Sequence, residues 1–168
     1  MKLLTLFTSV ALASWGAQAW SCLSDADAQG IADASVIFLS HQDIDLANRT
    51  AQALFADNIV EFGDSINSLR GDPLGTQVED NKATYIEDTL STPPIQQVNT
   101  LGIVHSCNQM VWFFEFIGIG PLRIRGFNLI TVDSSNKIIE QRVEFNSLAW
   151  AINIGFNVTP PATGPFSQ

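Results

Sequence analysis

Positive charge is scarce in this sequence. Its 168 residues include 8 Lys and Arg against 17 Asp and Glu, for a formal net charge of −9 at pH 7. Proteins that hold nucleic acid present a basic face or stripe, whereas here the basic residues are interspersed with carboxylates. We therefore expect no nucleic-acid partner, and an acidic surface that keeps the protein soluble.

Metal-ligating residues are also few. The chain contains 2 His, at His41 and His105, and 2 Cys, at Cys22 and Cys107. A metal site needs several ligands at suitable spacing, and these four residues form no Cys-x-x-Cys pair or His cluster. We expect neither a metal nor another cofactor.

No apolar run is long enough to span a membrane, which takes about 20 residues. Residues 109–122 are strongly apolar, but Glu115, Gly118 and Pro121 interrupt them, which is typical of a buried strand and its turn. The apolar run Leu3–Leu12 follows Lys2 and precedes a small-x-small cleavage sequence ending at Ala19. Residues 1–19 are thus predicted to be a secretory signal peptide, and the protein to be secreted or to reside in the lumen of the secretory pathway.

Export would place the chain in an oxidising compartment, where cysteines pair. We therefore predict a disulfide between Cys22 and Cys107, in preference to a catalytic or metal-binding thiol. The sequences beginning at Asn48 (Asn-Arg-Thr) and Asn157 (Asn-Val-Thr) are glycosylation acceptors, which also fits export.

After the leader, residues 20–158 suit a single domain, followed by a Pro-rich tail at 159–168. The apolar pattern predicts helices before residue 91 and strands after it, which is typical of an α+β domain with helices on one face of a sheet. The expected helices begin after the capping residue Ser24 and cover about 44–55 and 81–90. A short strand is expected at 58–62, and longer strands at 95–106, 109–117, 122–132 and 137–148. Because residues 63–80 contain several Gly and Pro, they are predicted to be a mobile loop over a pocket mouth.

Strand alternation suggests which side chains face the interior. In the last strand Gln141, Val143 and Phe145 share one face, and Glu140, Arg142 and Glu144 the other, where they would form a solvated or dimer-facing ladder of charges. In the strand before it Asn128 is the polar member of one face, and Phe127 and Leu129 lie on the opposite face, which would suit a homodimer. For residues 110–117 the pattern leaves open which face points inward. The predicted pocket is apolar and suits a lipophilic small molecule; it is lined by Phe62, Trp112, Phe114, Phe116, Gln141, Val143 and Phe145.

Several segments resemble a known superfamily. The junction Gln42-Asp43-Ile44-Asp45, the strand entry at 55–62 and the closing strands resemble the cone-shaped nuclear transport factor 2-like fold over residues 23–150. SnoaL-type polyketide cyclases, ketosteroid isomerase, scytalone dehydratase and limonene-epoxide hydrolase share that fold. The resemblance implies three N-terminal helices packed on a strongly curved, mostly antiparallel sheet with an internal apolar pocket. A closer resemblance, to small secreted fungal proteins of the superfamily, is carried by Cys22, 64–67, 105–107 and 144–150.

The catalytic signatures of those families are mostly missing. The Arg-x-Asp pair of limonene-epoxide hydrolase-like enzymes is replaced by Val-Trp-Phe-Phe-Glu at 111–115, and the position of their further Asp falls near Val143. Ketosteroid isomerase-like sites would correspond to Ser35, to Phe62 with Asp64 two residues on, and to Asn128. Of these, Asp64 and Asn128 could serve.

Asp64 is the first candidate for a general base, with capping of its own loop as the alternative role. His105 is a second proton-transfer candidate, with a structural role as its alternative. Glu115 could be a general acid if aromatic side chains bury it and raise its pKa; if it faces outward it is a surface charge.

The expected function is a cofactor-free cyclase, isomerase, dehydratase or epoxide-opening hydrolase acting on a lipophilic polyketide or terpenoid, with Asp64 assisted by Asn128, Gln141 or His105. The alternative is a non-catalytic carrier or extracellular effector.

Overall fold

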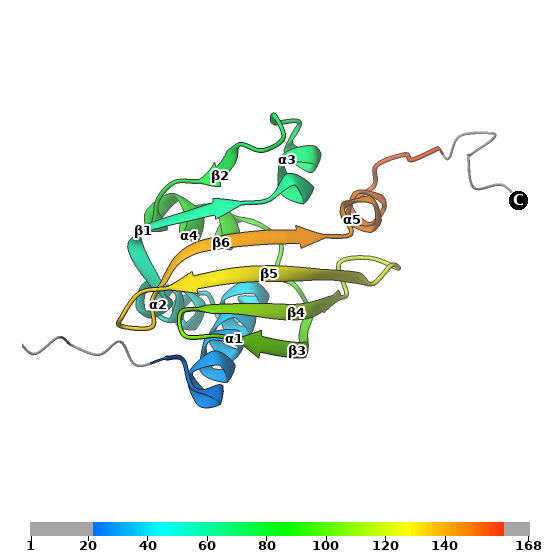
Figure 1. The fold of residues 1–168 in the computed structure, drawn as a ribbon. Coiled ribbons are helices and arrows are strands. Elements are labelled where there is room, and N and C mark those ends of the chain that lie inside the picture. Colours follow the sequence, from blue (N-terminus) through cyan, green and yellow to red (C-terminus); the bar gives the residue numbers. More distant parts are fainter. Residues whose placement is uncertain (1–21, 160–168) are drawn as a thin grey trace, which may run out of the picture.

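The structure is a computed structural model that describes residues 22–159. Three helices pack against one face of a six-stranded sheet, toward one end of its strands. Two short helices lie near the opposite end of the strands (Figure 1). The helices are α1 (Asp25–Ser40), α2 (Ile44–Leu54), α3 (Asp64–Arg70), α4 (Lys82–Ser91) and α5 (Ser147–Asn153). The strands are β1 (Phe55–Phe62), β2 (Gln77–Glu79), β3 (Gln97–His105), β4 (Gln109–Ile117), β5 (Ile124–Val132) and β6 (Ile138–Phe145). The α+β cone-like fold expected from the sequence is confirmed.

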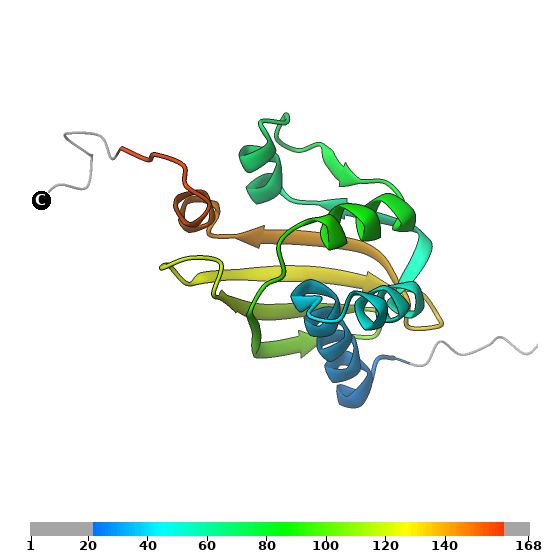
Figure 2. The ribbon, with the colours of Figure 1, turned by 180° about the vertical axis from the view of Figure 1, so that it is seen from behind.

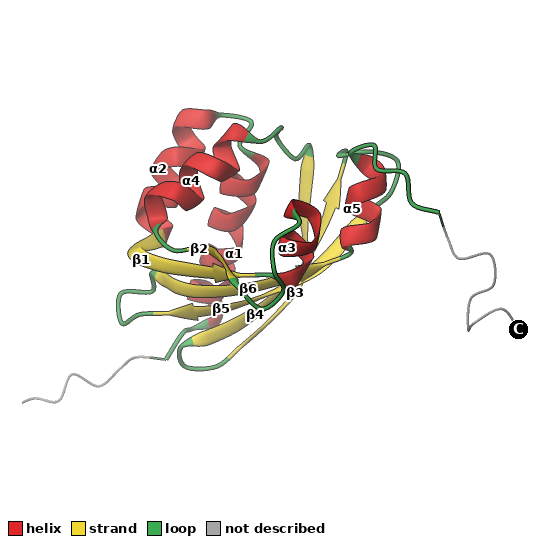
Figure 3. Ribbon diagram, turned by 90° about the horizontal axis from the view of Figure 1, so that it is seen from above, coloured by secondary structure: helices red, strands yellow, loops and turns green. Residues whose placement is uncertain are grey.

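The sheet has the strand order β2-β1-β6-β5-β4-β3. Strands β3 to β6 form an antiparallel meander, whereas β1 pairs in parallel with β6. Seen from above, the sheet curves beneath α1, α2 and α4, with α3 and α5 on the same side (Figure 3). The rear view shows the three longer helices lying across the sheet (Figure 2). The parallel pairing places residues near 61 beside residues near 141.

Each of the three longer helices begins at a side-chain cap. Ser24 and Asp27 form a capping box at α1, Asp43 accepts a hydrogen bond from the Leu46 amide at α2, and Asn81 accepts one from the Thr84 amide at α4. Such caps satisfy amide groups that a helix start otherwise leaves without partners. The helix predicted to begin after Ser24 and those predicted at 44–55 and 81–90 are confirmed, and the predicted bounds lie within two residues of the observed ones.

Residues 63–80 were predicted to be a mobile loop, and this prediction is wrong. The segment contains α3 and β2. The start of α3 is fixed by Glu144, whose carboxylate accepts hydrogen bonds from the Asp64 amide at 2.8 Å and the Ser65 amide at 3.1 Å. The last predicted strand was also too long. It ends at Phe145, and Asn146 caps α5 by accepting a hydrogen bond from the Ala149 amide.

Two groups of aromatic side chains fill the space between helices and sheet. Phe38, Phe55 and Tyr85 pack edge to face with ring centroids 4.9–5.4 Å apart. Along β4, Trp112, Phe114 and Phe116 are all buried and in ring contact with one another in sequence. This settles the choice that the alternation left open, because the set containing Trp112 points inward.

The predicted disulfide is present between Cys22 and Cys107. Beside it, the Leu23 amide donates a hydrogen bond to the Cys107 carbonyl at 2.9 Å, so the start of α1 is attached to the turn between β3 and β4. The acceptor residues Asn48 and Asn157 are exposed. The predicted signal peptide and nearly all of the predicted tail lie outside the described residues. Of the helices between residues 22 and 159, none is long and apolar enough to cross a membrane.

Candidate functional site

A buried carboxyl group lies on the inner face of β1. In this strand Ile59 and Glu61 point inward, and Glu61 is only 5% exposed. Its neighbours across the sheet are Glu79 in β2 and Gln141 in β6. Three polar residues from adjacent strands therefore meet at one place beneath α4.

Hydrogen bonds connect Glu61 to two amide side chains. Gln141 Nε2 donates to Glu61 Oε1 at 2.7 Å, and Asn128 Nδ2 donates to Gln141 Oε1 at 3.1 Å. Gln141 is 2% exposed and Asn128 is 6% exposed. The three side chains form a string across β1, β6 and β5, and we call Glu61, Gln141 and Asn128 the inner polar string.

Burial determines the charge of this site. It raises the pKa of Glu61 to about 8, with a further increase from the nearby charge of Glu79, while the Gln141 hydrogen bond and Arg70 act in the opposite direction. Burial and the charge of Glu61 also raise the pKa of Tyr85 well above its ordinary value. At neutral pH Glu61 is therefore mostly a neutral carboxylic acid, close to the point at which it can either donate or accept a proton.

Glu79, the neighbour of Glu61 in β2, is paired with a cation. Arg70 Nη1 and Nη2 both donate to Glu79 Oε1 at 3.1 Å, and Asp88 lies 3.7 Å from the same guanidinium. Burial raises the pKa of Glu79, and Arg70 opposes that rise. Arg70 thus compensates the charge of Glu79 and leaves Glu61 without an ion pair among the residues described.

Asp64 does not join this site. It is the first residue of α3, and its Oδ1 accepts a hydrogen bond from the Gly75 amide at 2.6 Å. That contact is the loop-capping role given above as the alternative to catalysis. Glu144, predicted to stand in a charge ladder, instead holds the start of α3, whereas Glu140 and Arg142 do pair on the outer face at 2.7 Å.

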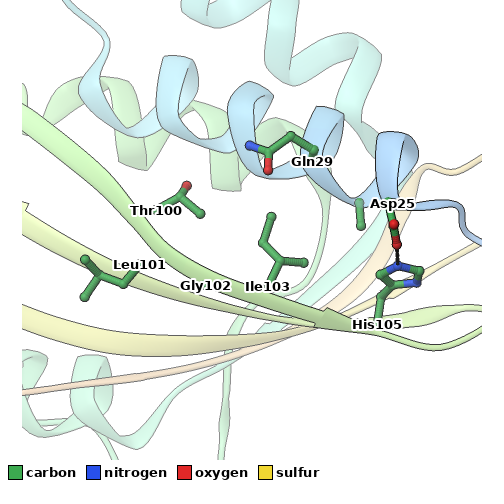
Figure 4. A pocket seen from close by; sticks show the side chains of 8 residues that line it. Asp25, Gln29, Thr100, Leu101, Gly102, Ile103 and His105 are labelled. Atoms are coloured by element: carbon green, nitrogen blue, oxygen red, sulfur yellow. Dashed lines mark hydrogen bonds and ion pairs between the residues drawn. The ribbon is translucent and has the colours of Figure 1, made fainter.

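His105 lies at the end of β3, away from the inner polar string. Its Nε2 is 2.7 Å from Asp25 Oδ1, and this hydrogen bond raises the pKa of His105. The pair borders a hollow of about 330 Å³ between α1 and β3, which Gln29, Thr100 and Ile103 also line (Figure 4). A second hollow of about 470 Å³ lies between α1 and α2.

Glu115 lies on the outer face of the sheet, which excludes the general-acid alternative. Its Oε1 is 2.9 Å from Arg125 Nε and 3.7 Å from Arg123 Nη1. The Arg125 hydrogen bond lowers the pKa of Glu115, and the surrounding polar side chains, rather than the protein interior, account for its 4% exposure. Phe62 is likewise not a pocket residue, because the Arg142 guanidinium lies 4.5 Å above its ring on the outer face.

The other predicted pocket residues do face the interior. Trp112, Phe114, Phe116, Gln141 and Val143 are buried, and Phe145 packs on Trp150 with ring centroids 5.2 Å apart. Neither hollow beside α1 includes any of them. The inner side chains pack against one another, so a ligand bound there would have to displace some of them.

Sequence reasoning missed Glu61, the central residue of this site. The available signal was the alternation of Ile59 and Glu61 with Val60 and Phe62, which puts an acid on the apolar face of a short strand. Counting from the resemblance to ketosteroid isomerase led to Phe62, one residue away and on the opposite face. Within residues 22–159, no group of three His, Cys, Asp or Glu side chains is arranged to hold a metal ion.

Solved structures share this architecture. A proposed isomerase from Bacillus subtilis is 16% identical with a TM-score of 0.59, and the match covers 79% of this chain and 95% of that one. A proposed isomerase of the SnoaL-like family from Agrobacterium tumefaciens is 14% identical with a TM-score of 0.55, over 72% of this chain and 98% of that one. A protein from Catenulispora acidiphila with a ketosteroid isomerase-like fold, solved with trimethylamine, is 11% identical with a TM-score of 0.57, over 77% and 97%.

At these identities the likeness shows the fold alone. A comparison with curated proteins found no match. The model of the NTF2-like domain, in contrast, matches residues 21–157. Because this match spans most of the chain, the protein belongs to the NTF2-like domain family.

Proposed function

We propose that the protein binds a lipophilic small molecule against the inner face of the sheet and catalyses a cofactor-free acid–base reaction with Glu61. The observation that carries the proposal is a carboxyl group buried beside apolar and aromatic side chains, held by Gln141, and with a pKa of about 8. Such a group exchanges protons efficiently near neutral pH. Glu61 takes the place that the sequence suggested for Asp64.

The proposed chemistry uses both forms of Glu61. The neutral acid would donate its proton to an oxygen of the substrate, and the carboxylate would remove a proton from carbon. Trp112 and Phe114 would hold the substrate and exclude water, which strengthens interactions with developing charge. Polyketides and terpenoids are the substrate classes that fit these apolar surroundings, and the reaction would be an isomerisation, cyclisation, dehydration or epoxide opening.

The neighbours described as proposed isomerases favour isomerisation among these reactions. The alternative is a non-catalytic carrier or extracellular effector. It is favoured by the structural contacts of Asp64, His105 and Glu115, which leave few groups for chemistry.

Deletion of the gene in its native host tests the proposal. We expect a lipophilic intermediate to accumulate and its isomerised, cyclised, dehydrated or ring-opened product to disappear, as measured by mass spectrometry of cells and medium. A gene encoding Glu61→Gln should fail to restore the product, whereas Glu115→Gln, which alters a carboxyl on the outer face, should restore it. An unchanged profile after deletion would favour the carrier or effector, and full restoration by Glu61→Gln would remove Glu61 from the mechanism.

We also propose export to the secretory pathway with removal of residues 1–19 and glycosylation at Asn48 and Asn157. The support is the leader pattern together with the disulfide. Mass spectrometry of the protein isolated from its host would find its N-terminus near residue 20 and any attached glycans.

A homodimer through the outer face of the sheet is a further proposal. Phe127 is 52% exposed and stacks on Phe113 with ring centroids 4.5 Å apart, and Leu129 beside it is 36% exposed. Sedimentation of the wild type and of Phe127→Glu would test it, because a dimer through this face should dissociate in the variant.

A further inference from the structure

The inner polar string ends at an acceptor with no partner. Asn128 Oδ1 is buried, and no group among residues 22–159 donates a hydrogen bond to it. Buried polar atoms normally have a partner, because desolvation without one is unfavourable. Asn128 lies opposite Trp112 of β4 and Val143 of β6, so its free acceptor is on the apolar inner face.

The direction of the hydrogen bonds explains why the acceptor is free. A carboxylate can only accept, so Gln141 must turn its NH₂ group toward Glu61 when Glu61 is ionised. The Gln141 oxygen then faces Asn128 and accepts from its NH₂ group, which is the arrangement in the structure, with donor–acceptor distances of 2.7 and 3.1 Å. The oxygen of Asn128 is left pointing away from the string.

Protonation of Glu61 permits the opposite direction. A carboxylic acid has an O–H that can donate to the oxygen of Gln141. Gln141 would then donate its NH₂ group to the oxygen of Asn128, and the NH₂ group of Asn128 would be left free. Both amides would have turned by half a rotation, with little change in the positions of their heavy atoms.

We propose that Glu61, Gln141 and Asn128 form a hydrogen-bond relay whose direction follows the proton on Glu61, so that Asn128 offers the ligand an acceptor when Glu61 is ionised and a donor when it is protonated. The ligand matched to the relay is a lipophilic molecule with one carbonyl or hydroxyl oxygen at Asn128. A ligand with a carbonyl oxygen binds best when Glu61 is protonated, and a ligand with a hydroxyl group binds best when Glu61 is ionised. This assignment of the ligand rests on the function proposed above, whereas the relay itself does not.

The other charged and titratable groups around Glu61 are paired, neutral or exposed, so the proton on Glu61 sets the direction of the relay. Glu79 from β2 is paired with Arg70 from α3, and Arg70 also contacts Asp88 of α4. Tyr85 of α4 stays neutral while Glu61 titrates, since its pKa is ordinarily about 10 and burial raises it further. The charged residues of α2, Asp45 and Arg49, are exposed, as is Arg142 of the adjoining strand β6.

Nuclear magnetic resonance of the ¹³C,¹⁵N-labelled protein tests the relay directly. The NH₂ signals of Asn128 and Gln141 would be assigned with Asn128→Leu and Gln141→Leu and followed as the Glu61 carboxyl titrates. We expect both NH₂ groups to change their shifts and their neighbouring protons together with that titration, and to stay constant in Glu61→Gln. The Glu79→Gln variant should keep the coupled change. Amide signals that stay constant while Glu61 titrates would overturn the relay, as would a Glu61 carboxyl that never titrates in the folded protein.

A matched pair of ligands tests the chemical class. We would measure the binding of 1-tetralone, a ketone, and 1-tetralol, its alcohol, by Trp fluorescence at pH values on either side of the Glu61 titration. The ratio of their dissociation constants should change by about tenfold in favour of the alcohol as pH rises, which corresponds to one hydrogen bond gained or lost. In Glu61→Gln the ratio should not depend on pH.

A constant ratio in the wild type, or no binding of either compound, would overturn the ligand class. The gene-deletion experiment is independent of this result. If the amide signals do not follow Glu61 but Glu61→Gln loses turnover, the relay fails and the acid–base function stands. If the amide signals do follow Glu61 but Glu61→Gln keeps full turnover, the relay stands and the acid–base function fails.

Discussion

Glu61 and Glu79 are cross-strand neighbours that differ in their counter-charge. Glu79 is paired with Arg70, whereas Glu61 has only the neutral amide of Gln141 as its hydrogen-bond partner, so no paired cation offsets the rise that burial causes in the pKa of Glu61. This difference could not be read from the sequence, because it depends on which strand pairs with β1 and on where α3 places Arg70. The inward positions of Asn128, Gln141 and Val143, in contrast, followed from alternation along single strands.

The stability of the protein should depend on pH through Glu61. Its pKa rises from an ordinary value of 4.5 to about 8 on folding, so between these values the folded state holds a proton that the unfolded state has lost. The contribution of this group is full below pH 4.5 and is lost as pH rises to about 8, by up to about 5 kcal/mol. Urea unfolding should show a flatter pH dependence in Glu61→Gln over this range, and equal slopes in both proteins would contradict the buried acid.

Gly126 is required by its surroundings in the curved sheet. A Cβ atom there would lie 2.5 Å from the Glu144 carbonyl oxygen and 2.6 Å from Phe114 Cζ. Gly126→Ala should therefore destabilise the fold by about 1–3 kcal/mol through overpacking. Gly30→Ala in α1 is the matched control, since nothing lies within 4 Å of its Cβ position, and it should stabilise the protein by about 0.5–1 kcal/mol. Thermal unfolding of both variants would test the contrast.

At the scale of elements, sequence signals correctly predicted the helices and strands that are stabilised by interactions between residues close in sequence. Ser24 caps its own helix, and the alternation in β4 and β5 reflects one buried face. Among the elements that prediction missed, α3 depends on a residue far along the chain. Residues 63–80 were read as a loop from their Gly and Pro, but the hydrogen bonds that fix the start of α3 come from Glu144, 80 residues away from Asp64.

Removal of that contact should loosen α3 specifically. Glu144→Ala leaves the Asp64 and Ser65 amides without their acceptor, so we expect a loss of about 1–2 kcal/mol and faster hydrogen exchange in residues 64–70. Glu140→Ala, on the same strand but paired with Arg142 on the outer face, should leave exchange in α3 unchanged. Comparable exchange in the two variants would show that α3 is held by its packing alone.

For the whole molecule, the disulfide is the main covalent constraint. It closes a loop with a sequence separation of 85 residues, and a loop of this size contributes on the order of 4 kcal/mol in the chain-entropy model. The double variant Cys22→Ser with Cys107→Ser should lose stability of this order in guanidinium unfolding. Reduced wild type should match the variant, and a variant as stable as the oxidised protein would show that the bond contributes little.

The parallel pairing of β1 with β6 also determines when the site can exist. Glu61 leaves the ribosome about 80 residues before Gln141, and chain synthesis proceeds at roughly 5–20 residues per second. For several seconds the growing chain carries β1 with β2 available at one edge but without β6 at the other, so Glu61 lacks its hydrogen-bond partner Gln141. The protein is therefore expected to complete its sheet only after almost all of the chain has been made, and chains that stop before β6 should be recognised as unfolded rather than persist as inactive copies.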